Sequence, residues 1–263
     1  FQPHFKPDFN LDLLRSNNYI CHFFVVRREI AEKTGGLRPE YNGAQDYDYI
    51  FRCTEMAGKI VHIPRGLYHW RVHSASTADN PASKLYAYEA GKKAIEGNLA
   101  RCGEEGTVTL RSDYGFYDVD YKLRGTPLVS ILIPNKDQDD TLRTCLESIK
   151  KKCMYPSYEI LIIENNSTEE ATFSYYKELE AQGIRVLKYP KQGFNYSAIN
   201  NFGVKEAKGE YLLFLNNDME IITPDFMEKM VSNLQRPQIG AVGAKLYYPD
   251  DTIQHAGVIV GLG

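Results

Sequence analysis

The sequence has 263 residues, of which 43% are hydrophobic and 25% are charged, and its formal net charge is -3. These values are typical of a globular protein and exclude the basic surface on which nucleic-acid binding depends. The longest apolar runs, 128–134 and 211–215, have the length of a strand and are too short to cross a bilayer. Five scattered cysteines form no CxxC pair, which indicates reduced core thiols rather than a disulfide framework or a metal site.

Residues 1–95 show an irregular series of candidate elements. In chain order these are a strand at 19–27, helices at 28–34 and 46–56, strands at 60–63 and 67–72, and a surface helix at 84–102. Residues 103–125 are polar and show little apolar pattern. We therefore expect a connector there, and with it a domain boundary.

From residue 126 onward, apolar strands alternate with amphipathic helices. The pattern predicts strands at 128–134, 158–164, 184–189, 210–216, 239–246 and 253–260, and helices at 139–152, 167–182, 195–208 and 224–234. Ser167 or Thr168 is the expected N-cap of the second helix. Because strands of this kind are buried on both faces, the sequence predicts an α/β fold with a mostly parallel sheet and helices on both faces.

Polar side chains follow three of the predicted strands, in Asn135–Asp137, Glu164–Asn166 and Asn216–Asp218. Ligands of such sheets bind beyond the carboxyl ends of the strands. A carboxylate there, such as Asp218, suits a hard divalent cation that keeps open positions for diphosphate oxygens. Asn and Asp are also common turn residues, so a strand-ending turn is the alternative. The acids at the other strand ends favour the metal site.

Three stretches carry a family resemblance: LVSILIPNKDQDDTLRTCLESI, YEILIIENNSTEE and FNYSAINNFGVKEAKGEYLLFLNND. In order and spacing they resemble the nucleotide-binding half of family 2 glycosyltransferases. Those enzymes have a GT-A fold and use a DxD motif to hold a divalent metal, Mn²⁺ or Mg²⁺, on a nucleotide-diphosphosugar. The likeness covers residues 126–263. It therefore implies a GT-A fold and a metal-dependent transferase.

The resemblance also implies roles for individual residues. The base and ribose pocket would be lined by Pro134, Asn135 and Asp137, with Glu164 or Asn165 on the nucleoside. The diphosphate and sugar would be bordered by Asn195, Asn200, Asn216, Asn217 and Asp218. Asn216 stands where the motif has its first acid, whereas Asp218, the expected metal ligand, is retained. This departure leaves the ribose and metal contacts open.

A second motif, GAQDYD at 43–48, resembles the ED motif in the acceptor half of the same family. Gln45 stands in place of the usual Glu, and Asp46 matches the catalytic base. An inverting transfer needs a carboxylate that removes the proton of the acceptor hydroxyl as its oxygen attacks the anomeric carbon. Acids at a helix start also favour the helix dipole, which is the alternative for Asp46 and Asp48. We expect Asp46 to be the base and Asp48 to be structural or acceptor-binding.

A third motif, LYHWRVHSAST at 67–77, places His69, Arg71 and His73 on one face of a strand. The resemblance implies that His73 helps to hold the metal or the diphosphate and that Arg71 contacts the diphosphate. A solvated strand face is the alternative.

The order of the halves is the reverse of the family order. We expect a piece of a protein with two tandem domains: an acceptor-binding half at 1–95, a helix and linker at 96–125, and a nucleotide-sugar-binding half at 126–263. We hypothesise that the halves dock as one permuted domain, within one chain or by exchange between two copies.

The expected function is a metal-dependent inverting glycosyltransferase that moves a sugar from a nucleotide-diphosphosugar to a glycan acceptor. The resemblance implies bacterial surface polysaccharide synthesis, in the cytoplasm or at the membrane in the full-length protein. The alternative is a non-catalytic sugar-nucleotide or glycan-binding module, because Gln45 and Asn216 depart from the acidic pattern. A nicotinamide-dependent dehydrogenase is disfavoured, because no GxGxxG motif follows the strand at 128–134.

Overall fold

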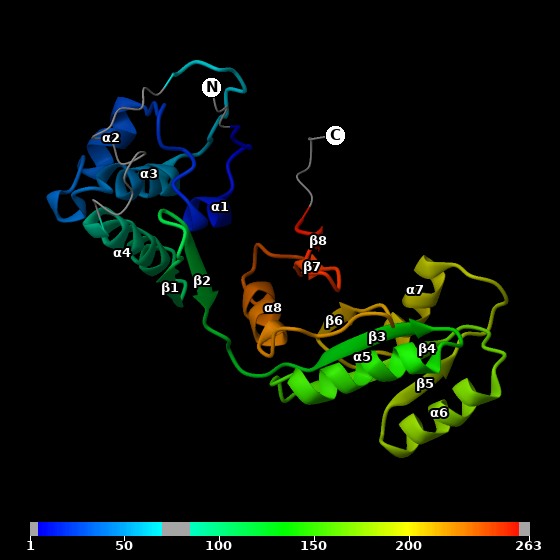
Figure 1. The fold of residues 1–263 in the computed structure, drawn as a ribbon. Helices are drawn as coiled ribbons and strands as arrows, with labels where there is room; N and C mark the ends of the chain where they lie inside the picture. The colour runs from blue at the N-terminus through cyan, green and yellow to red at the C-terminus, as the bar shows by residue number, and fades with distance from the viewer. Residues whose placement is uncertain (1–4, 70–84, 258–263) are drawn as a thin grey trace. The chain divides into compact units, whose positions relative to one another are not determined.

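The computed structural model describes residues 5–69 and 85–257. The chain divides into two compact units, Phe1–Lys122 and Leu123–Gly263, here called unit 1 and unit 2 (Figure 1). All five cysteines are free, but only Cys53 and Cys145 are buried; the prediction of core thiols is wrong for Cys102, which is exposed, and for Cys21 and Cys153, which are half-buried. In the described parts of both units, no helix combines the length and apolar character that a membrane span requires.

Unit 2 is built on a parallel sheet of four strands. They are β3 (Val129–Asn135), β4 (Tyr158–Glu164), β5 (Arg185–Lys188) and β6 (Tyr211–Phe214). The order across the sheet is β5-β4-β3-β6, and all three pairings are parallel. This parallel sheet confirms the sequence-based prediction for residues 128–216.

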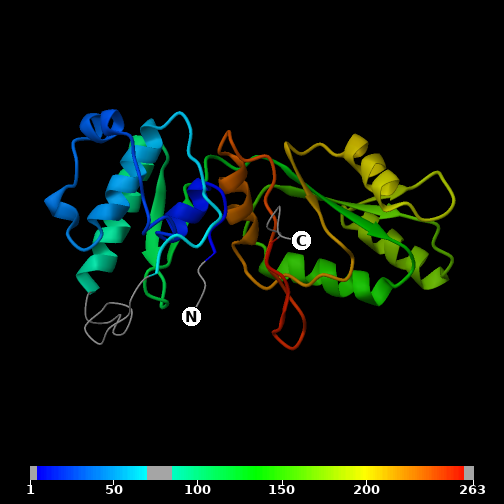
Figure 2. The same ribbon diagram turned by 90° about the horizontal axis from the view of Figure 1, so that it is seen from above.

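Helices cover both faces of this sheet. They are α5 (Asp139–Lys152), α6 (Glu170–Ala181), α7 (Tyr196–Glu206) and α8 (Phe226–Leu234). Ile131 and Ile133 of β3 pack with α5, α6 and α8, whereas Leu132 packs with α7. Figure 2 shows α5 and α7 on opposite sides of the strands. Since successive side chains of a strand point to opposite faces, apolar residues at every position produce this two-sided burial.

Two glycines allow close packing where α7 leads into β6. A Cβ on Gly203 would lie 2.5 Å from the Cδ1 atom of Ile163, so α7 lies directly on the sheet. A Cβ on Gly209 would lie 2.5 Å from the backbone nitrogen of Ser130. The amide of Gly209 instead donates to the hydroxyl of Ser130 at 2.8 Å. These contacts fix the start of β6 beside β3.

Two predictions for unit 2 are wrong in detail. The stretch 239–245 is not a strand; only a short antiparallel pair, β7 (Leu246–Tyr247) and β8 (Ile253–His255), forms nearby. Helix α6 begins at Glu170, and neither Ser167 nor Thr168 caps it. The amides just before that helix donate instead to a distant carboxylate, that of Asp137. Because Asp137 lies 31 positions before Thr168, the local sequence pattern does not reveal this cap.

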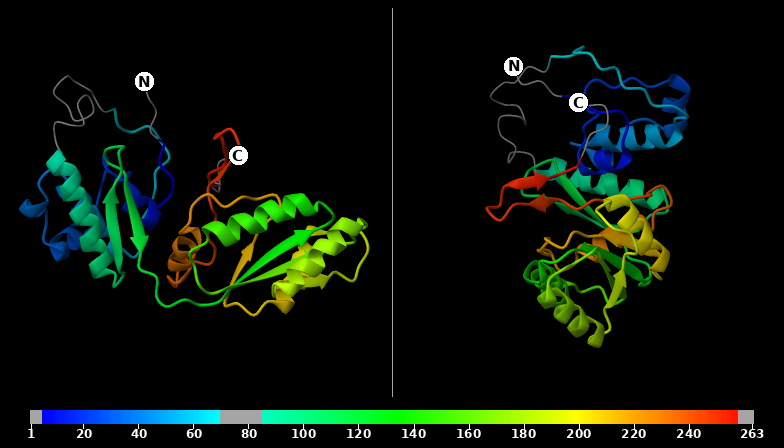
Figure 3. Two further views of the ribbon diagram at one scale, coloured as in Figure 1. Left: turned by 60° about the horizontal axis from the view of Figure 1, so that its bottom comes forward. Right: turned by 90° about the vertical axis from the view of Figure 1, so that its right-hand side faces the viewer.

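Unit 1 contains helices, a 3-10 turn and a hairpin around one core. The elements are α1 (Leu11–Ser16), α2 (Arg28–Thr34), η1 (Pro39–Tyr41), α3 (Gln45–Met56), α4 (Leu85–Arg101), β1 (Gly106–Leu110) and β2 (Tyr117–Tyr121). The core joins side chains of α3, α4 and the hairpin, among them Phe51, Ile95 and Val108. Figure 3 shows the hairpin beside α4.

The hairpin corrects the expectation of a connector at 103–125. Val108 and Tyr117 point into the core, with 1% and 4% of their surfaces exposed. Gly91 of α4 makes room for the tyrosine, since a Cβ there would lie 2.1 Å from the phenolic oxygen. That hydroxyl donates to the carbonyl of Tyr88 at 3.0 Å. Alternating burial is weak in a five-residue strand, so the sequence pattern did not indicate it.

The strands expected at 19–27 and 60–63 are absent, and so is any strand at 67–69. Where the strand at 19–27 was expected, the ammonium of Lys6 donates to the carbonyls of Ile20, Cys21 and His22 at 2.9, 2.8 and 2.8 Å. A lysine side chain thus takes carbonyls that a neighbouring strand would otherwise bind. The stretch is apolar in composition but irregular in structure.

Candidate functional site

Asn135, at the end of β3, is the centre of a buried amide network in unit 2. Its side chain is 3% exposed. Its Nδ2 donates to the hydroxyl of Tyr176 at 2.8 Å and to the carbonyl of Asp137 at 2.9 Å. Its Oδ1 accepts from Nδ2 of Asn217 at 2.6 Å. The network thereby joins the segments that follow β3 and β6, as expected for the carboxyl ends of neighbouring parallel strands.

Asp137 holds the segment before α6. Its Oδ1 accepts from the backbone amides of Thr168 and Glu169 at 2.7 and 3.0 Å, and its own amide donates to the hydroxyl of Ser167 at 2.9 Å. These backbone hydrogen bonds lower the pKa of the Asp137 carboxyl below its ordinary value. The carboxylate therefore stays ionised and fixes the loop between β4 and α6.

The end of β4 carries a buried acid and a buried amide. A carboxylate oxygen of Glu164 accepts from the amide of Ser167 at 2.5 Å. Asn165 is 3% exposed, and its Oδ1 is buried with no hydrogen-bond partner within the described part of the chain. A buried acceptor left unpaired costs about 1–3 kcal/mol, so this oxygen is suited to a ligand's donor. Pro134, which is half-buried, directly precedes Asn135 in β3 and pairs with Ile163 of β4.

Helix α7 begins at the same edge of the sheet. Asn195 caps it by accepting from the amide of Ala198 at 3.0 Å. The hydroxyl of Tyr196 donates to Oδ1 of Asn216 at 3.2 Å and so ties the helix start to the segment after β6. Asn200 is 5% exposed, and its Oδ1 is a second buried acceptor without a partner among the residues described.

Asp218 lies exposed in the turn after β6. Within residues 5–69 and 85–257, no hydrogen bond or ion pair engages its carboxylate, whereas Glu220 pairs with Lys152 at 3.5 Å. A carboxylate beside amide oxygens is the oxygen-rich donor set that Mg²⁺ and Mn²⁺ accept. The same described residues contain no cluster of three or more His, Cys, Asp or Glu side chains able to hold a metal.

Asp46 is the second residue of α3 in unit 1 and is half-buried. Its Oδ2 accepts from Nδ2 of Asn18 at 3.3 Å and from the thiol of Cys21 at 3.2 Å. Neither donor is expected from the sequence. The sequence pattern predicts a core thiol at Cys21 and a strand at 19–27, whereas the tertiary fold brings this stretch, as a loop, to α3.

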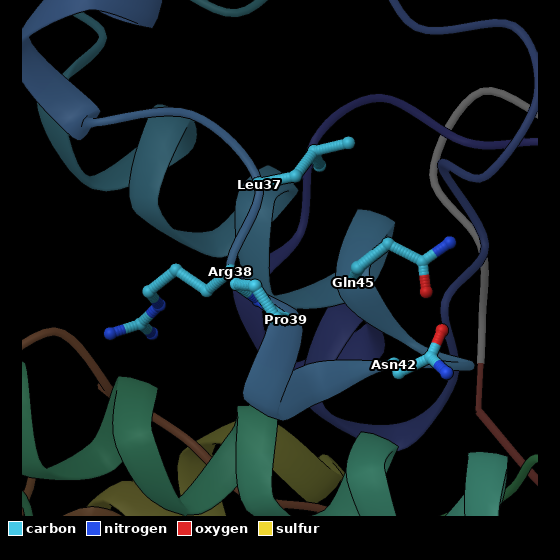
Figure 4. Close-up of a pocket in the computed structure, with 5 residues that line it drawn as sticks. All are labelled: Leu37, Arg38, Pro39, Asn42 and Gln45. Carbon is cyan, nitrogen blue, oxygen red and sulfur yellow. The ribbon is translucent and has the colours of Figure 1, made fainter.

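Gln45, the residue before Asp46, lines an open cavity of about 270 Å³ together with Leu37, Arg38, Pro39 and Asn42. Its Oε1 accepts from the amide of Gly43 at 2.8 Å. Figure 4 shows the side-chain amides of Asn42 and Gln45 facing one another, whereas the guanidinium of Arg38 points away from them. The cavity thus has a polar side at the start of α3.

Asp48 is a structural acid. Its side chain is fully buried and forms ion pairs with Arg38 and Arg52, the latter at 2.9 Å. Burial raises the pKa of this carboxyl, but the hydrogen bonds and charges of the two arginines outweigh burial and lower it. Arg52 also donates to the carbonyls of Thr34 and Gly36, so the ion pairs fasten α3 to the end of α2.

Arg71 and His73 lie outside the described residues, and their predicted roles remain predictions. In the described part of the same motif, the ring of Tyr68 stacks with His22 and Phe23 at centroid distances of 5.9 and 5.8 Å. Phe23 and Tyr68 are exposed. This aromatic surface connects to Asp46 through Cys21, whose sulfur lies 2.9 Å from Nδ1 of His22.

Three comparisons bear on this geometry. The sequence model of Glycosyl transferase family 2 matches residues 130–257. The chain is 46% identical over 260 residues to the O-antigen biosynthesis protein RfbC of Myxococcus xanthus, covering 99% of this chain and 20% of that protein. It is 43% identical over 265 residues to the uncharacterized protein y4gI of Sinorhizobium fredii, covering 99% of this chain and 29% of that protein. The chain thus spans less than a third of either relative.

Among solved structures, the mannosyltransferase PcManGT of Pyrobaculum calidifontis, in complex with GDP-Man and Mn²⁺, matches with a TM-score of 0.42 and 18% identity. The match covers 64% of this chain and 47% of that one. The family match coincides with the parallel sheet of unit 2 and with the polar residues at its strand ends. Unit 2, which contains the matched residues 130–257, is therefore a glycosyl transferase family 2 domain, with the α/β architecture predicted for it.

Proposed function

We propose that unit 2 binds a nucleotide-diphosphosugar at the carboxyl ends of β3, β4 and β6. The observation that supports this most directly is the pair of buried acceptors, Asn165 Oδ1 and Asn200 Oδ1, which have no partner in the described structure. The hydroxyl and N–H donors of a nucleoside can satisfy them. The start of α7 adds the backbone amides and positive dipole that favour a diphosphate.

We further propose that Asp218 holds a divalent cation, Mn²⁺ or Mg²⁺, with Asn216 and Asn217 beside it. Mg²⁺ in such sites is bound by one or two carboxylates and by the substrate's phosphate oxygens. When bound, the cation offsets the negative charge that develops on the leaving diphosphate.

In unit 1 we propose that Asp46 is the general base of an inverting transfer. Its carboxylate stands in the first turn of α3. The exposed rings of Phe23 and Tyr68 supply an aromatic surface near it for a glycan acceptor. The Myxococcus xanthus relative is an O-antigen biosynthesis protein, and by this likeness we propose a bacterial surface polysaccharide as the acceptor. We propose the cytoplasm, or the membrane in the full-length protein, as the place of the reaction.

The experiment is a transfer assay on the whole protein with a panel of nucleotide-diphosphosugars and Mn²⁺. Asp46→Asn keeps the side-chain shape and removes the base, so transfer falls by about 10²–10⁴-fold. Glu32→Gln, an exposed acid of α2, is the matched control and retains full activity. Full activity of Asp46→Asn contradicts the role of Asp46. Binding of donors without any turnover in the wild-type protein supports the second candidate, a non-catalytic sugar-nucleotide-binding module.

A further inference from the structure

The two carboxylate oxygens of Asp46 have different surroundings. Oδ2 accepts two hydrogen bonds, from Asn18 and Cys21, whereas Oδ1 has no partner in the part of unit 1 that is described. We propose that Asn18 and Cys21 are positioning residues, which hold Oδ2 so that Oδ1 is the oxygen that receives the proton of the acceptor hydroxyl. This inference rests on the proposed role of Asp46 as the base.

Cys21 acts as a donor in this arrangement and not as a nucleophile. Burial, followed by the nearby charge and hydrogen bond of Asp46, raises the pKa of the Cys21 thiol to about 12. The group therefore keeps its proton at physiological pH and can donate it to the carboxylate. The same sulfur lies 2.9 Å from Nδ1 of His22, so it is held from a second side.

The amide nitrogen of the Asn18 side chain contacts the proposed base, whereas its amide oxygen can accept a hydrogen bond from a ligand. Its Nδ2 donates to Asp46, and its Oδ1 is buried without a hydrogen-bond partner among the described residues. An acceptor sugar that presents its reacting hydroxyl to Asp46 can offer a neighbouring hydroxyl to this oxygen. One side chain then orients both the base and the sugar.

The loop that carries the two donors is fixed before any substrate binds. Tyr19, between them, is 6% exposed, and its hydroxyl accepts from the amide of Asn10 at 2.9 Å. Lys6 binds the carbonyls of residues 20–22. Groups held by packing and by such supporting contacts need no reorganisation during the reaction.

The step is a single displacement. The acceptor oxygen forms a bond to the anomeric carbon while the bond from that carbon to the diphosphate oxygen breaks. The hydroxyl proton moves to Oδ1 of Asp46, and the electron pair of the broken bond leaves with the nucleotide diphosphate. A carboxylate anchored through Oδ2 presents Oδ1 in one direction, which keeps the proton acceptor in line with the hydroxyl.

The test compares variants of the whole protein in the transfer assay. The double variant Asn18→Leu, Cys21→Ala removes both donors, and we expect kcat to fall about tenfold to a hundredfold with the donor KM unchanged. Cys21→Ser restores a hydrogen-bond donor and is expected to recover most of the kcat that Cys21→Ala loses. The matched control is Cys102→Ala, at an exposed thiol, which leaves kcat unchanged.

Thermal unfolding and circular dichroism establish that each variant is folded. A folded double variant with the kcat of the wild type overturns the proposal. If the double variant does not fold, equal kcat values for Cys21→Ala and Cys21→Ser overturn it instead. Failure of the proposed function gives a different result, because Asp46→Asn itself then keeps its activity.

Discussion

At the scale of single residues, a buried amide side chain at a strand end is expected to increase ligand affinity without increasing the free energy of unfolding. Asn165 keeps its Oδ1 buried and without a partner among the described residues, which destabilises the free protein and, in the function proposed here, is relieved when a nucleotide binds. We expect Asn165→Leu to leave the free energy of unfolding unchanged or to raise it, while nucleotide affinity falls about tenfold to a hundredfold. Urea unfolding and calorimetry measure the two quantities. A loss of stability without a loss of affinity would show that the side chain serves the fold alone.

Asp48 makes the stability of unit 1 depend on pH. Because its pKa is lower in the folded protein than its ordinary value of 3.8, its contribution to stability is complete above that value and is lost as the pH falls through the folded pKa. We expect the free energy of unfolding to decrease below about pH 4. Asp48→Asn should remove part of this decrease and, at neutral pH, cost about 3–5 kcal/mol, because Arg38 and Arg52 lose their partner.

Urea unfolding at a series of pH values tests this prediction. The control is Asp118→Asn, at an exposed acid of β2 that pairs with Arg111 at 3.3 Å, and it should change stability little. An Asp48→Asn variant with the same acid dependence as the wild type contradicts the account.

At the scale of elements, α7 must lie close to the sheet to bring its first turn to the site. Gly203→Ala places a Cβ 2.5 Å from Ile163, and we expect it to cost about 1–3 kcal/mol and to weaken nucleotide binding, because Asn195 and Tyr196 move with the helix. Gly243→Ala, where a Cβ meets nothing within 4 Å, is the control. Thermal unfolding and calorimetry measure both effects. An unchanged midpoint for Gly203→Ala contradicts the packing.

The elements that sequence alone predicts are those whose pattern is local. The continuous apolar runs of β3 and β4 and the spacing of Leu142, Cys145 and Ile149 in α5 predict their bounds within a residue. The loop at 19–27 has equally apolar residues, but its backbone carbonyls are taken by Lys6, a contact over fourteen or more residues. No local pattern encodes such a contact.

The candidate site likewise has parts that the sequence predicts and parts that it does not. Strand ends and the turn that carries Asp218 can be read from the chain, because a parallel sheet always brings them to one edge. The donors on Asp46 and the cap that Asp137 supplies to α6 cannot, because both depend on how separate segments pack. The residue types were visible in the sequence, whereas their partners were not.

At the scale of the whole molecule, the two units stand in an order that both long relatives share, since each aligns with 99% of this chain. This supports the proposal that an acceptor half precedes a nucleotide half within a longer protein. The docking of the two units as one permuted domain, within a chain or between copies, remains a prediction.

In the proposed function, unit 2 binds a nucleotide diphosphate through a cation at Asp218. Isothermal calorimetry of the chain with Mn²⁺ and a panel of nucleotide diphosphates tests it most directly. We expect association that requires the metal, is lost in Asp218→Ala and is kept in Glu178→Gln, an exposed acid on α6. Absence of binding to every nucleotide diphosphate, or undiminished binding by Asp218→Ala, would contradict it.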